Sequence, residues 1–104
     1  MFRVKISKKE EMAIRFHRHE DETICEIKTG SIGQPTKEMK DFAVAKSRRI
    51  PSDPYDKVVG HLVSLDRATK EMKSKERKKI FAAYAAWAKQ QGIRTSVNLN
   101  RVGI

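Results

Sequence analysis

Cysteine and long apolar runs are nearly absent from the sequence. The single cysteine, Cys25, cannot form an internal disulfide, and such a chain is typical of a reducing compartment. No stretch approaches the ~18 apolar residues that cross a membrane. Residues 1–12 also lack the apolar segment of a secretory signal. We therefore expect a cytoplasmic protein with no membrane partner, in the host cell cytoplasm if a phage encodes it.

Hydrophobic residues are also scarce. They make up 38% of the 104 residues, whereas globular proteins usually contain about 45–50%. A chain of this length is close to the size of one domain. We expect residues 1–104 to form one domain with a thin core, which leaves room for a partner or a second copy to cover apolar surface.

Motifs for catalysis are missing as well. The sequence contains no G-x-S-x-G, no phosphate-binding P-loop and no G-x-G-x-x-G. Cys25 is followed by Glu26, whose charge would raise the pKa of the thiol. His17 and His19 would share one face of a strand and could in principle bind a metal with Cys25 or His61, but structural zinc usually needs four organised ligands. We therefore expect no enzymatic activity, no cofactor and no metal.

The first half of the chain has the alternating pattern of β-strands. Apolar and polar residues alternate with a period of two, which is typical of half-buried strands. The stretches are Phe2–Ser7, Met12–His17, Thr23–Thr29 and the segment 41–49, in which Phe42 and Val44 alternate with Ala43 and Ala45. The segments between them, Lys8–Glu11, His19–Glu22 and Thr29–Thr36, are polar or contain glycine and proline. Residues 1–50 are therefore predicted to form an antiparallel meander of three or four strands.

The second half changes to helical spacing over residues 53–91. Asp53 and Pro54 predict a helix start, because aspartate accepts from first-turn amides and proline is tolerated at the first position. Apolar residues then recur at helical intervals, at Tyr55, Val58, Val59, Leu62, Leu65 and Met72. Gly60 should cost this helix about 1 kcal/mol relative to alanine. We expect a close neighbour to compensate for that cost.

A second helix is predicted over Lys75–Gln91. Ser74 is its expected cap and Gly92 its terminator. Its apolar stripe contains Ile80, Phe81, Tyr84, Trp87 and Ala88, and we expect Trp87 to anchor the helix in the core instead of stacking on bases. Residues 93–104 would add a strand or cover an edge. The expected fold is α+β, with an antiparallel three- or four-stranded sheet followed by two C-terminal helices packed on one face.

Positive charge is the strongest compositional signal. Lysine and arginine number 23 against 13 aspartates and glutamates, for a net charge of +10. Such a surplus attracts polyanions at long range. Nucleic acid is the commonest partner of this kind, and an acidic protein or a merely solvated surface are the alternatives.

Two segments concentrate this charge. The segment Arg67–Lys79 has a local charge of +5, and its basic residues are Arg67, Lys70, Lys73, Lys75, Arg77, Lys78 and Lys79. A second group is formed by Lys46, Arg48 and Arg49. Both could bind phosphates. The alternatives are a solvated helix face for the first group, and for the second an arginine that pairs with Asp53 or Asp56 to hold the turn.

The segment from Ser47 to Trp87 resembles a pattern of small uncharacterised proteins of tailed bacteriophages. The matching positions are Asp53, Tyr55, Lys57, Gly60, Leu65, Arg67, Ala68, Arg77, Ile80 and Tyr84. The sequence departs from the pattern at His61, where arginine is usual, and that weakens any anion-binding role for the position. The resemblance implies a phage origin and a strand–helix–helix ending, and it brings no established activity.

These observations predict a non-enzymatic nucleic-acid-binding accessory protein. It would contact phosphates with little readout of the bases, and nothing distinguishes DNA from RNA. The first alternative is an inhibitor or regulator of a host factor, whose acidic surface would meet the basic face. The second is a small assembly protein that forms a homodimer through exposed apolar surface.

Overall fold

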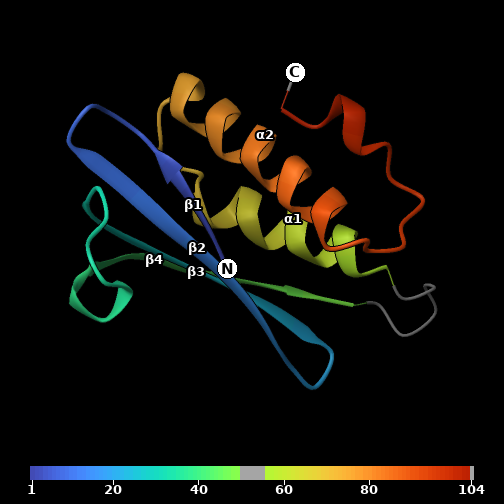
Figure 1. The fold of residues 1–104 in the computed structure, drawn as a ribbon. Coiled ribbons are helices and arrows are strands. Elements are labelled where there is room, and N and C mark those ends of the chain that lie inside the picture. Colours follow the sequence, from blue (N-terminus) through green and yellow to red (C-terminus); the bar gives the residue numbers. More distant parts are fainter. Residues whose placement is uncertain (50–55, 104) are drawn as a thin grey trace.

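The computed structural model describes residues 1–49 and 56–103, which form one sheet and a layer of helices. Within these residues the strands are β1 (Phe2–Lys5), β2 (Glu10–His19), β3 (Glu22–Ser31) and β4 (Lys40–Arg48), and the helices are α1 (Lys57–Ala68) and α2 (Ser74–Gln90). Short 3-10 turns occupy Thr36–Glu38 and Leu99–Arg101. Neighbouring strands are antiparallel in the order β1-β2-β3-β4. Both helices lie on one face of the sheet (Figure 1), so the predicted α+β fold is confirmed.

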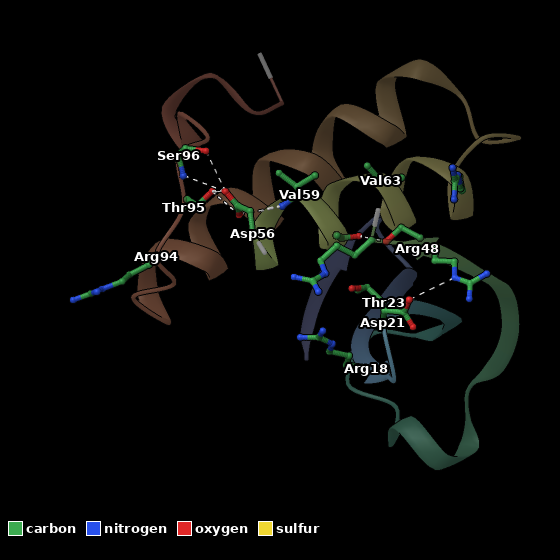
Figure 2. Close-up of a pocket in the computed structure, with 14 residues that line it drawn as sticks. Arg18, Asp21, Thr23, Arg48, Asp56, Val59, Val63, Arg94, Thr95 and Ser96 are labelled. Carbon is green, nitrogen blue, oxygen red and sulfur yellow. Dashed lines mark hydrogen bonds and ion pairs between the residues drawn. The ribbon is translucent and has the colours of Figure 1, made fainter. Parts of the chain in front are cut away.

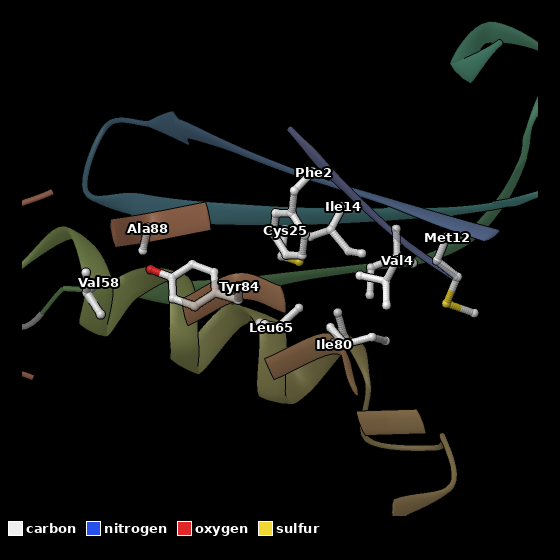
Figure 3. Packing of buried hydrophobic residues seen from close by; sticks show 12 residues of the cluster. Phe2, Val4, Met12, Ile14, Cys25, Val58, Leu65, Ile80, Tyr84 and Ala88 are labelled. Carbon is white, nitrogen blue, oxygen red and sulfur yellow. The ribbon is translucent and has the colours of Figure 1, made fainter. Parts of the chain in front are cut away.

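The register of the strands decides which side chains form the core. Ile14 of β2 lies opposite Ile27 of β3, and Phe16 lies opposite Cys25. Ile14, Cys25 and Ile27 are almost fully buried, and they pack in one cluster with residues of both helices. Figure 3 shows Ile14 and Cys25 of this cluster on the side of the sheet where the helices lie. The alternation seen in the sequence therefore marks the face that the helices cover.

Strand β4 presents its small residues to the core. Ala43 and Ala45 pack against the buried cluster, whereas Phe42 and Val44 are 44% and 62% exposed. Small side chains on the inner face allow α1 to lie close to β4. The larger apolar side chains are left on the open face of the sheet.

The helix termini differ from the predicted ones. Asp53 and Pro54 lie outside the described residues, and α1 begins at Lys57 with Asp56 as its N-cap. Ser74 is the first residue of α2 and not its cap, because Lys73 occupies the N-cap position without a side-chain hydrogen bond. Gly92 has a φ of +64° directly after α2, which is the conformation expected of a helix terminator.

An aromatic cluster joins the helices to the sheet. The rings of His61 and Phe16 stack with centroids 4.1 Å apart, and a hydrogen bond of 2.9 Å joins His61 Nδ1 to the Tyr84 hydroxyl. Trp87 lies 5.5 Å from Phe2 between ring centroids and is partly buried against the core. The predicted anchoring role of Trp87 therefore agrees with its packing, although the ring keeps an accessible edge.

The tail after α2 covers the helices. Within residues 92–103 it contains the Leu99–Arg101 turn and no strand. Ile93, Val97 and Leu99 pack against the core cluster. The tail therefore packs on the helix layer, whereas the sequence predicted an added strand or a covered edge.

Gly60 is a point of close approach between α1 and the sheet. A Cβ atom at this position would lie 2.6 Å from Thr23 Oγ1 and 3.3 Å from Thr23 Cβ. The carbonyl oxygen of Gly60 also accepts a hydrogen bond of 2.9 Å from the Ser47 hydroxyl. The glycine therefore allows the helix backbone to reach both β3 and β4, as the sequence predicted.

Gly60→Ala should lower the free energy of unfolding by about 1 kcal/mol, because crowding against Thr23 outweighs the better helix propensity of alanine. Urea denaturation measures the change. In a Thr23→Ala background the closest clashing atom is gone, so the same substitution should cost less or stabilise. A higher melting temperature for Gly60→Ala alone would contradict the close-packing argument.

His61 should make the fold sensitive to acid. Burial, with smaller contributions from the charges of Lys57 and the N-terminus, lowers the pKa of His61 from 6.5 to about 4. As the pH falls, His61 of the unfolded chain takes up a proton before His61 of the folded chain does. The contribution of neutral His61 to stability is therefore fully present above pH 6.5 and is lost toward pH 4, by about 3 kcal/mol at most. Urea denaturation between pH ~7 and ~4 should show a shallower loss for His61→Gln. His19→Gln, at an exposed position, should keep the wild-type slope, and equal slopes for all three proteins would exclude this role of His61.

Candidate nucleic-acid interface

A cleft of about 840 Å³ opens where α1, the β2–β3 hairpin, the end of β4 and the tail meet. The described residues that line it include Arg18, Arg48, Arg49, Arg67 and Arg94, together with Asp21 and Asp56. Its other described lining residues are small or apolar, namely Thr23, Ser47, Val59, Gly60, Val63, Thr95 and Ser96. Figure 2 shows Asp56, Thr95 and Ser96 on one side and Asp21, Thr23 and Arg48 on the other.

The floor of the cleft is set by the helix–sheet contact described above. Thr23, Ser47 and Gly60 all line it, and these are the residues that bring α1 onto β3 and β4. Val59 and Val63 follow along the same helix and are 45% and 36% exposed. The cleft thus combines an apolar strip with a rim of guanidinium groups.

The aspartates of the cleft are both engaged. Asp56 accepts from the amides of Val58 and Val59 and from the Thr95 hydroxyl at 2.9 Å. The Ser96 amide and hydroxyl also donate to Asp56, each at 3.2 Å. Partial burial raises the pKa of this carboxyl, but the hydrogen bonds outweigh that effect and hold it below its usual value. Asp56 therefore stays charged while fastening the tail to the start of α1.

Asp21 lies 3.6 Å from Arg48 Nε. The sequence left open whether Arg48 or Arg49 would pair with Asp53 or Asp56. The structure pairs Arg48 with Asp21, and the described partners of Asp56 are amides and hydroxyls. Asp53 lies outside the described residues.

The described lining residues leave the cleft positively charged. These residues include five arginines and two aspartates, which gives a net charge of +3. Arg67 Nη1 donates to the Lys46 carbonyl at 2.7 Å, and Arg18 Nε donates to the Glu20 carbonyl at 2.9 Å. A guanidinium has five N–H donors, so Arg67 and Arg48 retain donors that can face an anion. The guanidinium of Arg94 is directed away from the others in Figure 2.

The predicted basic residues divide into two groups. Arg48, Arg49 and Arg67 line the cleft, and Lys46 lies next to them, 3.7 Å from Glu22. The other group surrounds the turn between α1 and α2, which follows the last turn of α1 that contains Arg67 (Figure 1). It consists of the exposed residues Lys70, Lys73, Lys75, Lys78 and Lys79, which we call the lysine turn.

Arg77 belongs to neither of these groups, because its side chain makes contacts within the fold. It forms an ion pair with Asp66, and its Nε donates to the Thr69 hydroxyl at 3.3 Å. Its guanidinium also lies 5.9 Å from the centre of the Phe81 ring. Arg77 therefore joins the end of α1 to the start of α2, which reduces its capacity to bind a phosphate.

Sequence reasoning missed Arg18 and Arg94. Neither lies in a dense basic segment, and the fold brings them to Arg48 and Arg67 through the β2–β3 hairpin and the tail. A local clue existed for Arg18 alone, because a short hairpin after His19 places it near the start of β3 and hence near the end of β4.

The residues considered for metal binding and nucleophilic chemistry lie apart. Burial, and to a smaller extent Glu26, raises the pKa of Cys25 to about 12, so the thiol is protonated at neutral pH. His17 contacts Glu26 at 3.2 Å, whereas His61 lies in the core. Among the described residues no group of three potential ligands is placed to bind a metal ion. No helix in the described part of the chain is long and apolar enough to span a membrane.

Asp56→Ala should destabilise the protein by about 2 kcal/mol, because it removes a helix N-cap and the attachment of the tail together. Asp56→Asn is the matched control, since asparagine is also a good N-cap, and it should cost less. Hydrogen exchange at the Ser96 amide should accelerate more in the alanine variant than in the asparagine variant. Unchanged exchange at Ser96 in Asp56→Ala would show that the tail is held elsewhere.

No protein-family model, curated protein or solved structure matches the chain in comparisons with known proteins, so the phage origin and the function remain predictions.

Proposed function

We propose that this protein is a non-enzymatic nucleic-acid-binding accessory protein that contacts the phosphate backbone. The observation that supports this function best is the gathering of arginines from four separate parts of the chain around one cleft, with a net charge of +3 among its described lining residues. A phage origin, which the sequence pattern implies, belongs to the same proposal.

Arginine is suited to this role. Its planar guanidinium matches the oxygens of a phosphate, and it binds them by paired hydrogen bonds. Arg67 is held at the cleft by its hydrogen bond to the Lys46 carbonyl, so part of the entropy cost of ordering this side chain is already met within the fold. Arg48 lies 3.6 Å from Asp21 and stays exposed. Binding through phosphates carries little sequence information.

The lysine turn extends the positive surface. Arg67 of the cleft lies in the last turn of α1, three residues before Lys70, so the lysine turn begins where the cleft ends along this helix. The lysines are exposed, and their long side chains attract a polyanion without fixed geometry. One nucleic-acid strand could therefore contact both surfaces.

A regulator of a host factor remains the second proposal. The exposed valines beside the arginines would also suit a protein partner with an acidic and apolar surface. Exposed Phe42 and Val44 on β4 offer a further apolar surface for such a partner or for a second copy.

Changing Lys75, Lys78 and Lys79 together to glutamate should weaken binding to nucleic acid by about tenfold or more without unfolding the domain, because exposed charges contribute little stability. Fluorescence anisotropy with random-sequence DNA and RNA at low salt measures the affinity. For the wild-type protein on duplex DNA, the logarithm of the affinity should fall with the logarithm of salt concentration at a slope of about −3 to −5.

The matched control changes Arg15, Lys37 and Lys40 to glutamate. These residues are exposed and belong to neither the cleft nor the lysine turn. This variant has the same net charge as the lysine-turn variant and should lose less affinity. No binding of the wild-type protein to DNA or RNA at tens of micromolar would reject the nucleic-acid function and favour the regulator.

A further inference from the structure

We propose that the arginine cleft binds single-stranded nucleic acid in preference to duplex, an inference that rests on the proposed function. The shape of the cleft, the apolar strip on α1 and the placement of the arginines each support it.

The first argument is shape. The cleft is a hollow of about 840 Å³ between α1, the end of the sheet and the tail, which is within the range of sites that enclose small ligands, ~300–1,000 Å³. Duplex DNA is a stiff rod with a persistence length of about 50 nm, and it cannot bend into a hollow of this size. A single strand can turn into the cleft and place individual nucleotides inside it.

The second argument is the apolar strip. Val59 and Val63 lie one helical turn apart on α1, and both are at least 36% exposed beside charged residues. The faces of bases in a single strand are available for contact with such a surface, whereas the faces of stacked, paired bases are hidden. The described lining residues include no aromatic side chain. We therefore expect base contacts that are weak and tolerant of sequence.

The third argument is the placement of charge around this strip. Arg48 and Arg67 come from β4 and from the last turn of α1, so guanidinium groups flank the valines on the sheet side. Bases on the valines would leave the connecting phosphates near these arginines. For a strand that neutralises the net charge of +3, the log–log salt slope should be about −2, at ~0.7 per phosphate.

The experiment compares an oligothymidylate of about twelve nucleotides, a length within the site sizes of single-strand binders, with a mixed-sequence duplex of the same length. Anisotropy at one low salt concentration should show at least about tenfold tighter binding of the single strand. Val59→Glu with Val63→Glu places negative charge in the apolar strip at exposed positions, and it should weaken single-strand binding by about tenfold or more.

A second variant leaves all residues of α1 unchanged. Arg48→Ala with Arg49→Ala, both in the cleft lining, should also weaken single-strand binding and lower its salt slope. Arg15→Ala with Lys37→Ala removes the same charge outside the cleft and should lose less affinity. Circular dichroism and thermal unfolding establish that each variant is folded.

The outcomes separate this inference from the proposed function. Equal or tighter binding of the duplex, with both cleft variants unaffected, would overturn the single-strand inference and leave nucleic-acid binding in place. Binding of neither nucleic acid would overturn both. Competition by polyglutamate as effective as by oligothymidylate would show that the cleft recognises negative charge alone, which would also overturn the inference and favour an acidic protein partner.

Discussion

The close contact of α1 with the sheet at Gly60 is the constraint on which the rest of the structure depends. Because position 60 carries no side chain, the helix backbone approaches Thr23, and its carbonyl accepts a hydrogen bond from Ser47. This contact places His61 of the next position against Phe16 and Tyr84 in the core. It also brings α1 over the ends of β3 and β4, so one contact determines both the packing of the aromatic cluster and the floor of the cleft.

The opposite wall of the cleft depends on a second polar contact. Asp56 satisfies the first amides of α1 and, at the same time, binds Thr95 and Ser96 of the tail. The oxygens of an N-cap carboxylate that do not bind the helix amides ordinarily face water. Here they accept hydrogen bonds from the tail, whose Thr95 lies 39 residues further along the chain. Asp56 therefore keeps its negative charge, which is included in the net charge of +3 of the described lining residues, while it fastens the tail to α1.

Periodicity predicted the strands, the helices and the burial of Tyr84 and Ile80, because these follow from which face of an element is apolar. Gly60 was also predictable, since a glycine within a helix implies a close neighbour. The start of α1 was misplaced, because Asp53 and Asp56 both offer cap chemistry and the contacts of Asp56 with the tail are long-range. The start of α2 differs from the predicted one by a single residue. Long-range contacts likewise determine which residues line the cleft. The sequence named Arg48 and Arg67 as candidates, but only the register of the β2–β3 hairpin and the path of the tail add Arg18 and Arg94 to the same lining.

The two kinds of basic residue occupy two neighbouring surfaces, and this division has a physical consequence. Arginines lie at the cleft, where the Lys46 carbonyl orients Arg67 and Asp21 lies 3.6 Å from Arg48. Lysines lie at the exposed turn, where their charges are screened beyond about 10 Å at 0.1 M salt. Oriented guanidinium groups select the geometry of phosphates, whereas mobile ammonium groups mainly accelerate encounter. If both surfaces serve one ligand, the lysine turn should govern how quickly it arrives and the cleft how long it stays, because loosely held charges mainly change association rates, whereas contacts that the ligand buries inside the cleft change dissociation rates.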